Sequence, residues 1–570
     1  MPSALEIDTI LDNIFQCLDV VSLSKCLCVC KTFCLNAARP LLWKGHVIER
    51  WTRWQICNDN NLDWRQEFLT RIVVDTEIER QLQGICEDSK GQCSKISKLA
   101  DTYGVRALDV LTRVYLDSEK RSLTERHYAG RLIHRIKKRQ CLSFWSGQSN
   151  PDITSWPPTP GVMNSPTYIG LAMLSCAIMP FLEVDVKQVM NELALQFKEI
   201  YLTDSELSEF EKAKRLVYFM RLDLGFGAAK SYYDIHNSLI PSVLAYRRGV
   251  PLSLAVVYQG IAHLSDILGV DVMSFPGHVV VRHTEPGIES QMYIDLFQTQ
   301  LQPKPQAMIT AEDFASVDEE CIMTREQCEE RFISRYGMAI RINPGPGMFP
   351  REIYARCMRN IMNADTNTEY EHRGQYIRYH LMLTKYATSL QMAMCYAASR
   401  PQLQDFCLQV AEQHVPEDVD LLDPWVANLD RIKHIKRHDL KGQTFKPRIY
   451  DGLIDNYVRP VGSIVCRHKN GPASVVIRWT VDFDESGEPD VLMTLLGENM
   501  QIEHVYVRPS LCTSLKQSQA VKQFCTTLEI GKYFSYYDDH HGRFVPNAIW
   551  QRLFPKDDPK NFETYMTLQS

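Results

Sequence analysis

The chain has 570 residues, too many for one hydrophobic core, and this length predicts three or four domains. Hydrophobic residues make up 45% of it and charged residues 23%, which permits buried cores and excludes a wholly disordered protein. The formal net charge of −6 gives no overall reason to expect a polyanionic partner.

The 18 cysteines do not follow the pattern of a secreted disulfide framework. The first residues, Met-Pro-Ser-Ala-Leu-Glu-Ile-Asp, lack the basic and apolar regions of a signal peptide. No apolar run of about 18 residues predicts a membrane span. We therefore expect reduced thiols, a cytoplasmic or nuclear location and no membrane partner.

Residues 5–45 predict a group of helices. Apolar side chains recur there at spacings of three and four, the period of an amphipathic helix, first as Ile7, Ile10, Leu11, Ile14, Phe15 and Leu18 and then as Leu23, Leu27, Val29 and Phe33. The segment Pro40-Leu-Leu-Trp-Lys44 closes the unit. About forty residues cannot build a self-sufficient core, so we expect a partner to cover part of this apolar surface.

This pattern resembles the F-box, through I-L-D-N-I-F-Q-C-L-D, then L-S-K-C-L-C-V-C-K-T-F and P-L-L-W-K, over residues 1–48. The resemblance implies docking on a Skp-family adaptor of a cullin-RING ubiquitin ligase. It assigns the adaptor-binding or supporting positions to Leu11, Ile14, Phe15, Leu18, Val29, Cys30 and Lys31. The Leu-Pro pair that usually opens an F-box is absent. The alternative is a three-helix cap that packs only on its own chain.

The cluster Cys26, Cys28, Cys30 and Cys34 has alternate-residue spacing inside a helical pattern, unlike the C-x2-C pairs of zinc sites. We expect buried free thiols there, and neither a metal nor a cofactor elsewhere. Residues 49–160 continue as a mostly helical connecting region that ends in the turn-rich Trp156-Pro-Pro-Thr-Pro-Gly161.

Residues 237–297 carry a histidine and a carboxylate in two predicted strands. His278 opens the β-branched run P-G-H-V-V-V-R, and Asp295 lies in Y-I-D-L-F. Such a pair orients and polarises the base of a Cys-His-Asp site. The cysteine should open the helix after Arg247-Arg248-Gly249, where a helix N-terminus lowers a thiol pKa. The sequence there is Val250-Pro-Leu-Ser253 instead.

With R-R-G-V-P-L-S-L-A-V-V-Y, these segments resemble the SirB-type branch of the transglutaminase-like fold, a papain-type α+β domain that we place at 161–310. Active members attack an amide carbonyl with a cysteine. Aligned without gaps, Pro251 stands at that position, and a shift of two residues offers Ser253. We therefore expect no catalytic residue and interpret His278 and Asp295 as a degenerate framework, a buried pair that joins two strands. Serine chemistry, or a distant thiol such as Cys176 or Cys321, remains the alternative.

Residues 311–440 regain helical periodicity and resemble the tetratricopeptide-like tail of SirB-type proteins. Residues 448–570 change to strand periodicity and resemble the YccV-like domain, a small β-barrel named for binding DNA. This segment holds 13 Lys+Arg against 15 Asp+Glu, a net of −2. DNA binding usually needs a basic face, so we favour protein recognition, with nucleic acid as the alternative.

The resulting fold class is multidomain α+β, with a helical F-box and connecting helices, a transglutaminase-like domain with a helical tail, and a YccV-like barrel. Together the resemblances imply a non-catalytic substrate receptor of an SCF (Skp-cullin-F-box) ubiquitin ligase that binds client proteins and promotes their degradation. Two alternatives stay open. One is a hydrolase or transglutaminase that uses the central site, and the other is a DNA-binding protein that acts through the barrel.

Overall fold

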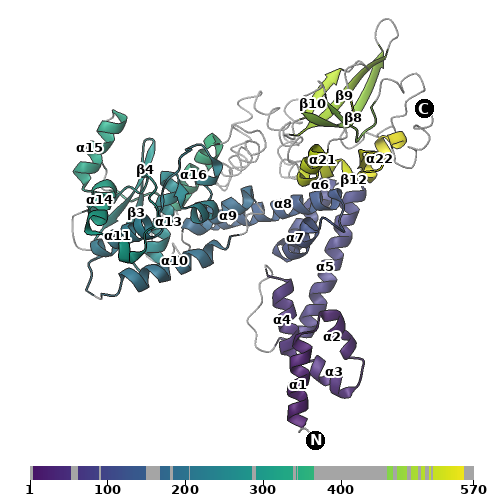
Figure 1. The fold of residues 1–570 in the computed structure, drawn as a ribbon, viewed down its shortest axis with the longest axis horizontal. Coiled ribbons are helices and arrows are strands. Elements are labelled where there is room, and N and C mark those ends of the chain that lie inside the picture. Colours follow the sequence, from purple (N-terminus) through teal and green to yellow (C-terminus); the bar gives the residue numbers. More distant parts are fainter. Residues whose placement is uncertain are drawn as a thin grey trace, which may run out of the picture. The chain divides into compact units, whose positions relative to one another are not determined.

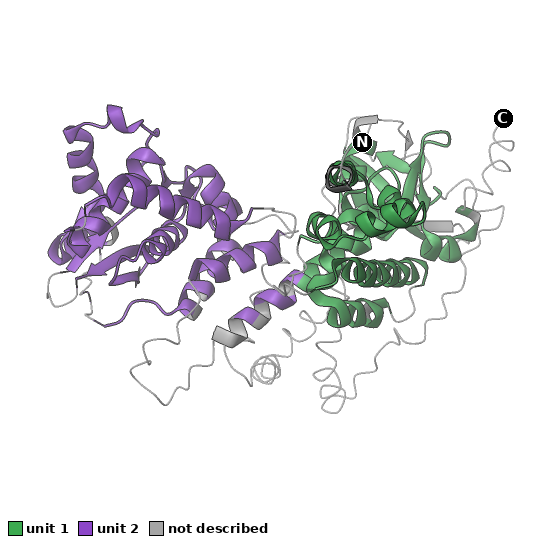
Figure 2. Cartoon of the chain, turned by 90° about the horizontal axis from the view of Figure 1, so that it is seen from below, with its two compact units in different colours: residues 1–136, 415–570 green, residues 137–414 purple. Residues whose placement is uncertain are grey.

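The computed structural model describes residues 4–52, 62–88, 92–148, 167–179, 184–204, 206–285, 291–337, 342, 345–364, 459–466, 472–483, 489–498, 502–506, 513–514 and 518–557. The chain forms two compact units (Figure 2). Unit 1 combines residues 1–136 with 415–570, and unit 2 comprises residues 137–414. None of the helices in the described ranges is both long and apolar enough to cross a membrane.

Unit 1 begins with four short helices (Figure 1): α1 Ala4–Gln16, α2 Val20–Cys26, α3 Lys31–Ala37 and α4 Pro40–Arg50. The Asp19 side chain caps α2 by accepting from the Ser22 N–H, and Pro40 occupies the first turn of α4, where its missing N–H is not needed. Phe15 is buried against Phe33, with ring centroids 5.4 Å apart. The amphipathic period of the sequence therefore predicts these helices correctly.

The helices that follow are α5 Trp64–Glu87, α6 Gln92–Tyr103, η1 Gly104–Ala107, α7 Leu108–Leu116 and α8 Leu123–Gln148. A buried carboxylate, Asp75, joins them to the end of α4. It accepts a hydrogen bond from Trp51 Nε1 at 3.1 Å and forms ion pairs with Arg50 and Arg113. Two cations and an indole N–H thus compensate one buried charge.

The C-terminal part of unit 1 contains a five-stranded antiparallel sheet in the order β10-β9-β8-β7-β11. Its strands are β7 Ile464–Cys466, β8 Ala473–Phe483, β9 Pro489–Gly497, β10 Ile502–Tyr506 and β11 Thr513–Ser514. A hairpin of β12 Phe534–Asp538 and β13 Arg543–Pro546 accompanies it, with α21 Ser518–Thr526, η7 Leu528–Lys532, α22 Ala548–Leu553 and η8 Pro555–Asp557. The described part of residues 448–570 contains strands, as its periodicity predicts, and the YccV-like barrel remains a prediction.

This C-terminal part packs on α8. Thr124 Oγ1 donates a hydrogen bond to the Phe534 carbonyl at 3.0 Å, and both groups are buried. A Cβ at Gly531 would lie 2.0 Å from the Leu123 carbonyl oxygen, so only glycine permits this approach. The connecting region up to residue 136 therefore shares one compact unit with the C-terminal strands, whereas the end of α8 belongs to unit 2.

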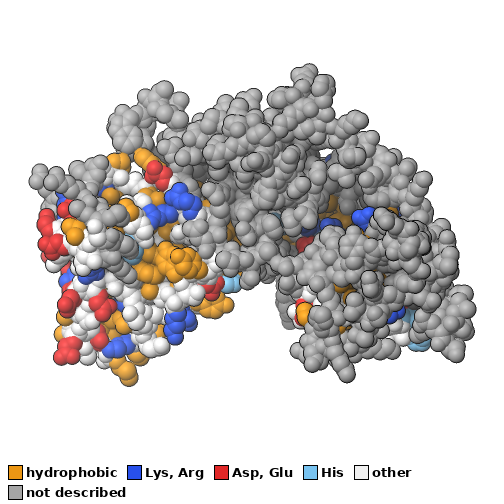
Figure 3. Space-filling view, turned by 90° about the horizontal axis from the view of Figure 1, so that it is seen from above, with side chains coloured by type: hydrophobic (Ala, Val, Ile, Leu, Met, Phe, Trp, Pro, Cys, Tyr) orange, Lys and Arg blue, Asp and Glu red, His pale blue; other side chains and the backbone are white. Residues whose placement is uncertain are grey.

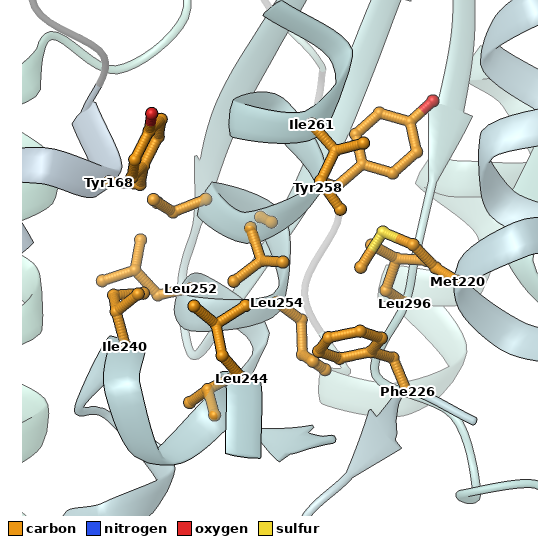
Figure 4. Close-up of a cluster of buried hydrophobic side chains, with 14 of the residues drawn as sticks. Tyr168, Met220, Phe226, Ile240, Leu244, Leu252, Leu254, Tyr258, Ile261 and Leu296 are labelled. Atoms are coloured by element: carbon orange, nitrogen blue, oxygen red, sulfur yellow. The ribbon is translucent and has the colours of Figure 1, made fainter. Parts of the chain in front are cut away.

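Unit 2 is built around a buried helix, α13 Pro251–Leu264, whose side chains are almost all inaccessible (Figure 4). The helices α9 Thr167–Ile178, α10 Val186–Tyr201, α11 Glu209–Tyr218, α12 Ile240–Tyr246 and α16 Pro350–Ala364 surround it, with η2 Phe219–Asp223 and η3 Ile235–Asn237. Because α13 is apolar on all sides, it must be covered on all sides.

One side of α13 is covered by an antiparallel sheet in the order β3-β4-β5-β6. The strands are β3 Val270–Phe275, β4 His278–Thr284, β5 Gln291–Ile294 and β6 Ile322–Met323. On the opposite face of this sheet lies α15 Arg325–Tyr336, which follows η4 Gln306–Met308 and α14 Ala311–Cys321. A separate two-stranded parallel pair joins β1 Gly227–Ala228 to β2 Arg248–Gly249. These elements define a mixed α+β domain.

The structure differs from the sequence-based expectation at the cysteine cluster of residues 26–34. Cys28, Cys30 and Cys34 are exposed and Cys26 is half-buried, so the prediction of buried thiols was wrong. Cys28 and Cys30 lie in the turn between α2 and α3, and Cys34 lies on the side of α3 that faces away from the core. Most of the helical tail predicted at 311–440 lies outside the described residues, apart from α14, α15 and α16.

Candidate functional site

The predicted histidine–carboxylate pair exists and is buried. His278 Nε2 lies 3.0 Å from Asp295 Oδ2, and the side chains are 4% and 3% exposed. His278 is the first residue of β4, as expected, whereas Asp295 directly follows β5. The second oxygen, Oδ1, accepts the Phe297 N–H at 3.0 Å, so both carboxylate oxygens have a donor.

The environment of Asp295 favours its charged form. Burial raises the pKa of this carboxyl, but the hydrogen bond and the positive charge of His278, together with the Phe297 N–H, outweigh burial and hold the pKa below its usual value. The backbone is fixed as well, because the Asp295 N–H donates to the Cys321 carbonyl at 2.8 Å. The carboxylate is thus positioned to orient an imidazole.

Aromatic rings flank the imidazole. The His278 ring centroid lies 5.9 Å from that of Phe297 and 5.8 Å from that of Phe332 on α15. Along β4, Val279 belongs to the cluster around α13, whereas Val280 packs with Phe332 on the opposite face of the sheet. The His278 ring therefore packs towards α15. No hydrogen-bond partner for Nδ1 is found among the described residues.

The structure also describes Pro251 and Ser253, the two positions that the sequence offers for a nucleophile. Pro251 is the first residue of α13, and Val250 precedes the helix without a side-chain cap. Ser253 is buried, and its hydroxyl lies 2.7 Å from the Asn237 carbonyl and 3.0 Å from the Val250 carbonyl. The acceptors for the Ser253 hydroxyl are thus two backbone carbonyls. Among the described residues, no hydrogen bond joins Ser253 to His278.

The alternative thiols are poor nucleophiles. Burial, supported by the nearby charge of Asp295, raises the pKa of Cys321 to about 12. The pKa of Cys176 is raised too, also by burial, with Lys137 opposing the shift. Both thiols are therefore protonated at neutral pH. Because the thiolate is the nucleophilic form, neither side chain is activated for attack. Neither thiol has a hydrogen bond to His278.

Sequence reasoning missed a residue that supports this site from α16. The Arg356 guanidinium donates to the carbonyls of Phe275 at 3.0 Å and His278 at 2.9 Å, and also to the Ser274 hydroxyl. It fastens the turn between β3 and β4, which sets the backbone of His278. Nothing in the sequence marks this arginine, because 78 positions separate it from His278.

The predicted adaptor-binding residues divide into two groups. Ile14, Val29, Cys30 and Lys31 are exposed, with Ile14 at 49% and Val29 at 63%. Phe15 is buried in the core of the four helices, and Leu11 and Leu18 pack partly against that core. The first group is available to a partner. The second group supports the fold.

Comparison with known families gives two matches. A model described as F-box-like matches residues 8–49, and a model described as Transglutaminase-like superfamily matches residues 184–335. No match was found among curated proteins or among solved structures. The chain therefore carries an F-box-like domain and a transglutaminase-like core, as the sequence motifs predict. The second match contains α13 and the His278–Asp295 pair.

Proposed function

We propose that the chain is the substrate-recognition subunit of an SCF (Skp-cullin-F-box) E3 ubiquitin ligase and binds client proteins through its central and C-terminal domains. The observation that carries this proposal is the F-box-like match at residues 8–49. Within it, large apolar side chains are exposed, as expected of a surface that a partner covers: Ile10, Ile14, Val21, Val29, Leu35, Leu41 and Ile48.

The order of the domains supports the same role. An F-box followed by a SirB-type transglutaminase-like domain and a YccV-like domain resembles the architecture of F-box only protein 21. In this role the chain performs no bond chemistry. It binds the adaptor at one end and the client elsewhere, and so raises the effective concentration of a client lysine near the ligase's charged partner enzyme.

The central domain acts in this proposal as a binding domain without catalysis. Pro251 offers no reactive group where the family places its cysteine, and the Ser253 hydroxyl is engaged by two backbone carbonyls. A panel of glutamine-amide, ester and peptide substrates tests this point with the purified chain. We expect no turnover. Turnover that disappears in Ser253→Ala would show that the domain is an enzyme.

Adaptor binding is tested by affinity capture of the wild-type chain and of Ile14→Glu/Val29→Glu. Both side chains are exposed, so the double variant should fold while losing apolar contact with the adaptor. Leu195→Glu on α10 is the matched control, because Leu195 is 59% exposed in the other unit. We expect the double variant to lose the adaptor and the cullin, and the control to retain both.

Equal recovery of the adaptor from wild type and the double variant would refute docking through this segment. Proteins that are recovered in larger amounts with the double variant than with wild type are client candidates, because they remain bound without being ubiquitinated. The same proteins should be recovered at wild-type levels with Leu195→Glu.

A further inference from the structure

A strip of exposed tyrosines and basic side chains lies around β1 and β2 in unit 2. Tyr246 ends α12 and is 62% exposed, and Tyr233, in the loop after β1, is 65% exposed. Arg248 and Lys230 are exposed between them. Figure 3 shows hydrophobic side chains beside charged ones on one face of unit 2. We call Lys230, Tyr232, Tyr233, Tyr246, Arg247 and Arg248 the tyrosine strip.

The pairing of the two short strands brings the Arg248 and Lys230 segments side by side. The strands run parallel, with Gly227 opposite Arg248 and Ala228 opposite Gly249. Tyr246 precedes this pairing and the Lys230–Tyr233 loop follows it. The exposed tyrosines and cations therefore lie at the two ends of this short strand pair.

The strip has an excess of positive charge without ion-pair partners. Residues 226–250 contain Lys230, Arg247 and Arg248 but a single carboxylate, Asp234, which accepts from the His236 N–H. In the described part of the chain, none of the three cations forms a salt bridge. A lone cation in such a place is most stable when an anion from another molecule approaches it.

Arg247 gives this observation further support. Its guanidinium lies over the Phe226 ring, 4.9 Å from the centroid, and its Nη1 atom is buried without a hydrogen-bond partner among the described residues. A buried guanidinium nitrogen without an acceptor lowers the free energy of unfolding, because its lost hydration is not replaced. A carboxylate that approaches the exposed part of the Arg247 side chain would pair with the guanidinium charge, although not with Nη1 itself.

Aromatic contacts connect the strip to the degenerate site. The Tyr233 and Tyr232 rings meet at 5.4 Å, Tyr232 meets Phe297 at 6.0 Å, and Phe297 meets His278 at 5.9 Å. The strip therefore adjoins the buried His278–Asp295 pair. Tyrosines supply large, rigid contact areas for peptides.

We propose that the tyrosine strip binds an acidic, extended peptide segment of a client protein, with carboxylates on Arg247, Arg248 and Lys230 and apolar side chains on the tyrosines. This proposal rests on the receptor function, since it names the chemical class of the client segment. It is independent of the F-box, because no residue of the strip lies within residues 8–49.

The test measures fluorescence anisotropy of labelled peptides with the full-length chain. Three peptides of about 12 residues share Leu, Pro and Tyr positions and differ in the others, which are Asp/Glu, Asn/Gln or Lys/Arg. We expect saturable binding of the acidic peptide that weakens as salt is added. Lys230→Glu/Arg248→Glu should weaken it at least tenfold, and Tyr233→Ala/Tyr246→Ala should also weaken it.

Lys187→Glu/Arg359→Glu is the matched control, since both side chains are exposed in unit 2 and the change in net charge is identical. It should bind the acidic peptide within twofold of wild type. Equal binding of all three peptides, equal loss in the control, or no binding of the acidic peptide at millimolar concentration would overturn the proposal. Adaptor capture by Lys230→Glu/Arg248→Glu should remain normal, so failure here is distinguishable from failure of the receptor function.

Discussion

Replacement of Asp295 by alanine probes whether the buried pair stabilises unit 2. The change removes the carboxylate that accepts from the His278 ring nitrogen and from the Phe297 N–H. Both donors are then left without an acceptor in the protein interior. An unsatisfied buried donor costs about 1 to 3 kcal/mol, and loss of one member of a buried ion pair costs about 3 to 5 kcal/mol. We expect the opening free energy of β4 to fall by about 3 to 5 kcal/mol.

Hydrogen exchange measured by mass spectrometry is a suitable assay, because it reports opening segment by segment in a chain with two compact units. Peptides from β4 and α13 should exchange faster in Asp295→Ala, while peptides from α5 in unit 1 should be unchanged. A change below about 0.5 kcal/mol in β4, the scale of an ordinary surface substitution, would refute a structural role for the pair.

The same pair predicts a dependence on pH. The pKa of Asp295 is lower in the folded state, since His278 and the Phe297 N–H outweigh the effect of burial. Its contribution is therefore fully present above the unfolded carboxyl pKa of about 3.9 and is lost as the pH falls through the folded pKa. Protection of β4 should decrease in acid for wild type, and this part of the decrease should be absent in Asp295→Ala.

Three further predictions concern other parts of the chain. Ser253→Ala should lower the stability of unit 2 by only about 1 to 2 kcal/mol in the same exchange assay, because both carbonyls that it contacts also accept a backbone N–H. Gly531→Ala should expose α8 to limited proteolysis, since its Cβ would overlap the Leu123 carbonyl; unchanged cleavage would contradict this packing. A maleimide should label Cys28 quickly and Cys321 only after unfolding, because Cys28 is exposed whereas Cys321 is buried with a pKa of about 12. Rapid native labelling of Cys321 would contradict its burial.

At the central site, short sequence patterns predict the helix and the strand that the structure contains. The run after Gly249 predicts a helix with proline in its first turn, and α13 begins at Pro251. The β-branched run after His278 predicts β4. Both follow from local patterns, since helix starts and strands depend on backbone preferences and on periodicity within a few residues.

Other features depended on contacts between distant residues. The support of His278 by Arg356 and the linked rings of Tyr232 and Phe297 join parts of the chain that no short pattern relates. The exposure of Cys28 was misjudged for a related reason. Cys28 lies in the turn between α2 and α3, and whether a turn residue is covered depends on segments elsewhere in the chain.

The sequence by itself determined that this protein has an F-box-like segment, a histidine–carboxylate pair and no cysteine at the start of the central helix. Only the tertiary structure decided which contacts those residues make. It placed Ser253 against backbone carbonyls, His278 between aromatic rings, and Lys230, Arg247 and Arg248 beside exposed tyrosines. The physical reason is that residue type sets which interactions are possible, whereas packing selects which of them are formed.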